Sequence, residues 1–90
     1  MNAARILEMI QREMADARRK YGHFTSAHEG YGVLVEEVAE LLEAIRANDL
    51  DCAQAESCQV AAVAWRIALS LGVWETQCRS GMLEVKNGRC

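Results

Sequence analysis

Residues 33–45 decide the fold, and they read VLVEEVAELLEAI. Apolar side chains recur there every three or four residues, which is the period of an amphipathic helix rather than of a strand. On a helical wheel, at about 100° per residue, the apolar and acidic side chains fall on opposite faces. We expect the apolar face to be buried; it comprises Leu34, Val38, Leu41, Leu42 and Ile45.

Signals for the start and the end of this helix lie on either side. Ser26 and Glu29 fit a capping box, in which the serine accepts from the third amide and the glutamate reaches back. The helix is therefore expected to run to about Asn48. Gly30 and Gly32 lie inside it, although each costs about 0.5–1 kcal/mol relative to Ala.

Two further helices flank the first one. Apolar residues repeat at helical spacing over residues 3–20, and this helix is expected to end near Gly22. Asn48 and Asp49 supply a break and a new cap, and a third helix runs from about Leu50 to Leu71, ending at Gly72. Because the connections are short, neighbouring helices should be antiparallel. The predicted fold is an all-α, antiparallel helical bundle of three main helices, with a helical domain over residues 1–72 and an extension of little regular structure over 73–90.

The chain is short for the apolar material that it carries. It has 90 residues, of which 51% are hydrophobic, and the predicted helix over residues 50–71 is apolar nearly all round. Domains of this size bury only about 60–65% of their unfolded surface. A second copy of the chain is the simplest way to bury the excess apolar surface, so we expect the bundle to be completed by homodimerisation.

Charge is unevenly distributed. The net charge is −3, yet residues 21–51 hold seven acidic side chains against one basic one. No basic stripe of useful length exists, so nucleic acid is not expected as a direct partner. Neither a secretory leader nor an apolar run of membrane-spanning length is visible, which favours a cytoplasmic protein without membrane contact. The four cysteines match no zinc spacing.

The acidic face of residues 33–45 is a candidate metal site. Glu36, Glu37, Glu40 and Glu43 fall within about 120° of one another on the wheel. Like charges at i and i+4 are mildly destabilising, and no basic residue follows on this helix until Arg46. Such a stripe favours binding of a cation.

Glu56 lies in the middle of an apolar face of the third helix. A buried carboxylate is costly unless it is protonated, paired with an arginine, or bound to a metal shared with the acids of the second helix. Facing helices that project carboxylates inward are a common metal site in bundles. Oxygen ligands select hard ions, so the expected cofactor is Mg²⁺ or Mn²⁺.

These residues carry a family resemblance. Glu36-Glu37-x-x-Glu40, followed by Glu56 on the next long helix, resembles the signature of the MazG-like all-α nucleoside triphosphate pyrophosphohydrolases. The lead-in YGHFTSAHEGYG, residues 21–32, and the segment ESCQVAAVA, residues 56–64, resemble a compact branch often found in phage and other mobile DNA. The resemblance covers about residues 5–70.

The resemblance implies a Mg²⁺-dependent hydrolase that converts a nucleoside triphosphate to the monophosphate and pyrophosphate. Glu36, Glu37, Glu40 and Glu56 would be metal ligands or the base that orients water. Gln59 stands where the family has Asp, and it can coordinate only through its carbonyl oxygen. Further substrate contacts are implied at phosphate, base or sugar; the candidates are Arg18, Arg19, Lys20, His23, His28 and Tyr31.

Two other functions stay open. The chain could be a non-catalytic helical binding module that keeps the MazG-like fold without turnover, as Gln59 suggests. It could also be a purely structural dimerisation domain, which would explain the apolar third helix but not Glu56.

Overall fold

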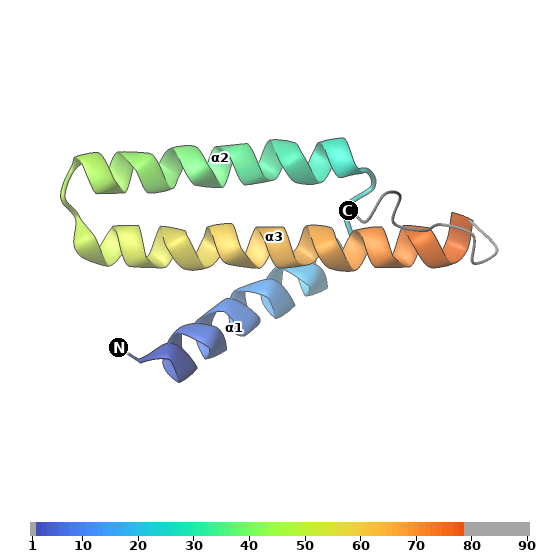
Figure 1. The fold of residues 1–90 in the computed structure, drawn as a ribbon, viewed down its shortest axis with the longest axis horizontal. Coiled ribbons are helices and arrows are strands. Elements are labelled where there is room, and N and C mark those ends of the chain that lie inside the picture. Colours follow the sequence, from blue (N-terminus) through green and yellow to red (C-terminus); the bar gives the residue numbers. More distant parts are fainter. Residues whose placement is uncertain (1, 79–90) are drawn as a thin grey trace, which may run out of the picture.

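The computed structural model describes residues 2–78, which form three helices. They are α1 (Ala3–Tyr21), α2 (Ala27–Arg46) and α3 (Leu50–Cys78), shown in Figure 1. The all-α prediction is confirmed for this part of the chain. None of these helices combines the length and the apolar character that a membrane span requires.

Polar side chains cap the starts of the helices much as the sequence predicts. The Ser26 hydroxyl accepts from the backbone N–H of Glu29 at 3.0 Å, and Glu29 Oε1 accepts from the Thr25 N–H at 2.8 Å. The glutamate therefore reaches one residue beyond the cap. Asp49 Oδ1 caps α3 by accepting from the N–H of Cys52 at 3.1 Å.

The end of α3 differs from the prediction. The helix passes through Gly72 and continues to Cys78, so the expected end at Gly72 is wrong. Glycine favours a helix end where it takes a positive φ, and Gly22 does so after α1 whereas Gly72 does not. Inside a helix glycine costs only about 1 kcal/mol, which neighbouring turns outweigh. The remainder of the predicted extension, residues 79–90, lies outside the described residues.

The helices are arranged around α3, which packs against both others. α2 and α3 form a long antiparallel hairpin, as expected (Figure 1). α1 instead crosses α3 obliquely and runs in the same general direction, with Glu13 near Gln59 and Gly22 near Arg66. The short connection does not place α1 antiparallel beside α2, because residues 22–26 carry the chain across α3.

Small residues line the contact between α2 and α3. Gly30 is buried, and a Cβ added there would lie 2.8 Å from Ile67 Cγ1. Further along, Ala44 of α2 and Cys58 and Ala62 of α3 are buried. At Gly30 the absence of a Cβ leaves room for the Ile67 side chain of α3, so the two helices approach closely there.

This close approach changes which face of α2 is buried. The predicted stripe is only partly covered, since Leu34 and Leu41 are half-buried while Val38, Leu42 and Ile45 remain 44–54% exposed. The prediction of a buried stripe is wrong for these three residues. The face against α3 is rotated toward the acidic side of the helix, and Glu37 is half-buried as a result.

Candidate functional site

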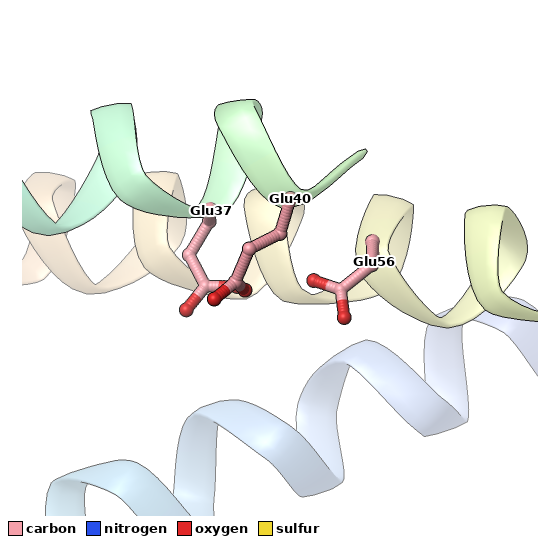
Figure 2. Close-up of side chains that lie close together, drawn as sticks. All are labelled: Glu37, Glu40 and Glu56. Atoms are coloured by element: carbon pink, nitrogen blue, oxygen red, sulfur yellow. The ribbon is translucent and has the colours of Figure 1, made fainter. Parts of the chain in front are cut away.

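Three glutamates from α2 and α3 meet where the two helices pack together. Glu37 and Glu40 project from α2 and Glu56 from α3, and one carboxylate oxygen of each lies within 4.8 Å of the others. Figure 2 shows the three carboxylates gathered at one place. The antiparallel hairpin brings them together, because Glu37 and Glu40 are one turn apart on the flank of α2 that borders α3. We call this set the carboxylate cluster.

Like charges and burial shift the titration of the carboxylate cluster. Burial, followed by the charges on Glu40 and Glu56, raises the pKa of Glu37 to about 7. Burial and the charge on Glu40 also raise the pKa of Glu56. Glu56 Oε2 is buried and has no hydrogen-bond donor among the described residues.

An arginine does not resolve this repulsion. Within residues 2–78, the ion pairs join Arg5 and Arg12 to Glu8, and Arg19 to Asp16, all on α1. Of the three resolutions expected for Glu56, a proton or a bound cation therefore remains. Three carboxylates at this spacing fit a hard divalent ion, since each offers an anionic oxygen.

A cavity of about 530 Å³ opens beside the carboxylate cluster. Its lining residues come from α1, the loop over residues 22–26, α2 and α3, and Glu37 belongs to both the cavity wall and the cluster. The side chains that line it are Glu13, Ala17, Tyr21, His23, Phe24, Thr25, Glu29, Val33, Glu37, Gln59, Ala62, Val63 and Arg66. A volume in this range accommodates a nucleotide-sized ligand.

Gln59 contacts α1 through its amide. Its Nε2 donates to Glu13 Oε2 at 2.8 Å, so α1 brings a carboxylate to the position where Gln59 lacks one. Glu13 was not among the residues predicted from the sequence. A signal existed, because Glu13 falls on the wheel beside Ile10 and Ala17, on the apolar face of α1.

Arg66 occupies the other end of the cavity and is only 7% exposed. Its guanidinium lies 4.2 Å from the centre of the Phe24 ring, and its Nη2 donates a long 3.5 Å hydrogen bond to the Gly22 carbonyl. Nε is buried, with no partner in the described part of the chain. Burial lowers the pKa of Arg66, yet a guanidinium stays charged in proteins.

The loop beneath Arg66 is tied to α3 by Ser70, which is fully buried. Its hydroxyl accepts from the Phe24 N–H at 3.1 Å and lies 3.4 Å from His23 Nδ1. The sequence offered Arg66 and Ser70 only as interruptions of an apolar helix. Their roles depend on a contact across more than forty residues, which no local pattern reports.

The remaining predicted site residues lie elsewhere. Glu36 is exposed and is not part of the carboxylate cluster. Lys20, His28 and Tyr31 are exposed and lie outside the described cavity lining, as do Arg18 and Arg19. Tyr21 and His23, from the same segment, line the cavity instead.

Comparison with protein-family models, with curated proteins and with solved structures gives no match to this chain.

Proposed function

We propose that the chain is a Mg²⁺-dependent nucleoside triphosphate pyrophosphohydrolase of the MazG-like type, which releases a nucleoside monophosphate and pyrophosphate. The observation that carries the proposal is the carboxylate cluster at the wall of a nucleotide-sized cavity. Three acids from separate turns converge without a basic partner among the described residues. That arrangement destabilises the metal-free protein, and a divalent cation relieves it.

The proposed ligands are Glu37, Glu40 and Glu56. When bound, Mg²⁺ neutralises charge on the phosphates and lowers the pKa of a coordinated water. The reaction consumes one water: its oxygen bonds to phosphorus, the bridging P–O bond between the α- and β-phosphates breaks, and a proton is released.

Glu13 is the proposed acceptor of that proton. Gln59 holds the Glu13 carboxylate at 2.8 Å, in the same cavity wall as Glu37. Gln59 lies one helical turn beyond Glu56 on α3, and Glu13 is not a member of the carboxylate cluster. An acid supplied by α1 would compensate for the amide that α3 carries at residue 59.

The test is pyrophosphate release from a panel of nucleoside triphosphates, with and without Mg²⁺. We expect release only in the presence of Mg²⁺ or Mn²⁺. No release from any triphosphate, together with no Mg²⁺ or Mn²⁺ binding by calorimetry, would refute the proposal.

A non-catalytic binding module is the second candidate, and the amide at residue 59 favours it. Gln59 brings no negative charge, and its Nε2 is already committed to Glu13. Metal binding in calorimetry without turnover of any triphosphate, and without loss of binding in Glu13→Gln, would support this alternative.

We further propose that the protein is a homodimer. One flank of α2 presents a continuous run of large, exposed apolar side chains, namely Tyr31, Val35, Val38, Leu42 and Ile45. Buried hydrophobic residues of the described chain are few and mostly small, and this flank offers five large apolar side chains that a second copy could cover. Light scattering at micromolar concentration should give twice the mass of 10.0 kDa, and Val38→Glu should shift the protein to monomer. A monomeric mass for the unmodified chain would contradict the proposal.

A further inference from the structure

The cavity is bordered by the carboxylate cluster through Glu37 and by Arg66, whose charge is partly offset by Glu29, which also lines the cavity. The carboxylate cluster lies at one end and Arg66 at the other, and both Glu56 and Arg66 belong to α3. Ten residues separate them along this continuous helix, which places their Cα atoms about 15 Å apart, almost three turns. A phosphate held by a cation at the cluster is therefore remote from Arg66, and an extended nucleotide would meet the guanidinium with its base.

Arg66 has more hydrogen-bond donors than it uses within the described chain. A guanidinium carries five N–H groups and no acceptor. The one hydrogen bond from Arg66 in the described chain is the 3.5 Å contact with Gly22, and buried Nε has none. A buried donor without an acceptor is costly, and more so when it is charged. The cavity end is therefore complementary to a ligand edge that presents acceptors.

Aromatic rings complete this end of the cavity. Phe24 covers one face of the guanidinium at 4.2 Å, which leaves the edge of the fork to contact a ligand. Tyr21 also lines the cavity and is 73% exposed, so its ring is free for a base to stack on. Stacking on an aromatic side chain accepts every base, whereas the hydrogen-bonding edge distinguishes them.

We infer that Arg66 selects nucleotides whose base carries a keto oxygen at C6 of a purine or C4 of a pyrimidine, as in guanine, uracil and thymine, over adenine and cytosine, which carry an amino group at that position. Guanine offers O6 and N7, and thymine offers O4, as acceptors to a guanidinium. Adenine and cytosine present an amino donor at the corresponding position, which Arg66 cannot accept. The orientation of the nucleotide in this inference rests on the proposed function.

The first experiment measures kcat/KM for GTP, UTP, ATP and CTP with Mg²⁺. We expect GTP and UTP to be favoured over ATP and CTP by about 5- to 150-fold. Arg66→Met should reduce that ratio to about one, and Arg66→Lys, which keeps the charge without the fork, should give a ratio between the two. Arg46→Met, at an exposed arginine of α2, is the matched control and should keep the preference. Equal turnover of all four triphosphates, or a preference that survives in folded Arg66→Met, would overturn the inference.

A second experiment separates this inference from the proposed function. Binding of GMP, UMP, AMP and CMP is measured by calorimetry without divalent ions, and the Arg66 Nε–H signal of the unmodified protein is followed by NMR. Tighter binding of GMP and UMP, with a shift of that signal, supports the inference even if no triphosphate is hydrolysed. Equal binding or no binding of the four overturns it. Pyrophosphate binding that disappears in Arg66→Met would also overturn it, since Arg66 would then be a phosphate contact.

Discussion

The two ends of the cavity differ in the sign and in the number of the charged side chains near them. At one end three carboxylates crowd together, and at the other a single guanidinium lies over a phenyl ring with a weak contact to a carbonyl. Glu56 and Arg66 are on one helix and carry opposite charge, yet the spacing keeps them from neutralising each other. A fold selected for stability alone would pair them or replace them. In the proposed function, a bound cation at one end and a nucleotide base at the other would supply partners for these charges.

Removing a carboxylate should have the largest effect. Glu37→Gln and Glu56→Gln each take a ligand charge from the proposed metal site, so kcat/KM for Mg²⁺-dependent pyrophosphate release should fall by about 100-fold or more. The same changes relieve repulsion, so the metal-free variants should melt at a higher temperature than the unmodified protein. Glu43→Gln, on an exposed position of α2, is the control for both measurements. Full activity in Glu56→Gln would contradict the assignment.

Glu36 is the residue at which the family signature and the carboxylate cluster of the structure disagree. The family signature includes Glu36, whereas in the structure its exposed side chain is not part of the carboxylate cluster. Glu36→Gln should therefore retain far more activity than Glu37→Gln in the same assay.

Glu13→Gln should have the next largest effect. Loss of a general base commonly lowers kcat by about 100-fold or more, while Mg²⁺ binding persists because Glu13 is not a proposed ligand. The measurement is kcat beside the calorimetric Mg²⁺ affinity. Loss of Mg²⁺ binding in this variant would show that Glu13 is a ligand and not a proton acceptor.

Protonation should weaken the binding of Mg²⁺ to the carboxylate cluster by about tenfold. Since the pKa of Glu37 is raised to about 7, protons compete with Mg²⁺ below that pH, and the dissociation constant should be about tenfold larger at pH 6 than at pH 8. Isothermal titration at the two values measures this change.

The metal-free protein should show the opposite trend in stability. Between the ordinary value of 4.5 and about 7, the folded chain binds more protons at Glu37 than the unfolded chain does. The free energy of unfolding therefore falls as pH rises through this interval, and the raised pKa of Glu56 acts in the same direction. Urea unfolding at pH 5 and pH 8 without divalent ions measures it. A rise in stability over this interval, or an unchanged slope in Glu37→Gln, would contradict the shift assigned to Glu37.

The last prediction concerns Ser70, near the guanidinium end of the cavity. Ser70→Ala leaves the buried Phe24 N–H without its acceptor and should lower the free energy of unfolding by about 1–3 kcal/mol. Ser57→Ala, at an exposed position of α3, is the matched control and should change it by less than about 0.5 kcal/mol. Equal effects of the two substitutions would mean that Ser70 does not hold the loop under Arg66.

Local patterns in the sequence determined the helices and part of the site. The capping box at Ser26, the positive φ of Gly22 and the break at Asn48 are local features, so the starts of all three helices and the ends of α1 and α2 follow closely from them. The stripe of acids on α2 and a lone acid in an apolar face of α3 likewise pointed to Glu36, Glu37, Glu40 and Glu56, of which the last three meet in the structure.

Only the tertiary structure decided which faces meet. Gly30 and Ala44 allow α2 to approach α3 closely, and this rotates the buried face toward Glu37, leaving Val38, Leu42 and Ile45 exposed. The path of α1 across α3 brings Glu13 to Gln59 and Gly22 to Arg66. A helical wheel reports the polarity of one helix, whereas packing depends on the shapes of two, and so the cavity and its guanidinium end were beyond the reach of the sequence.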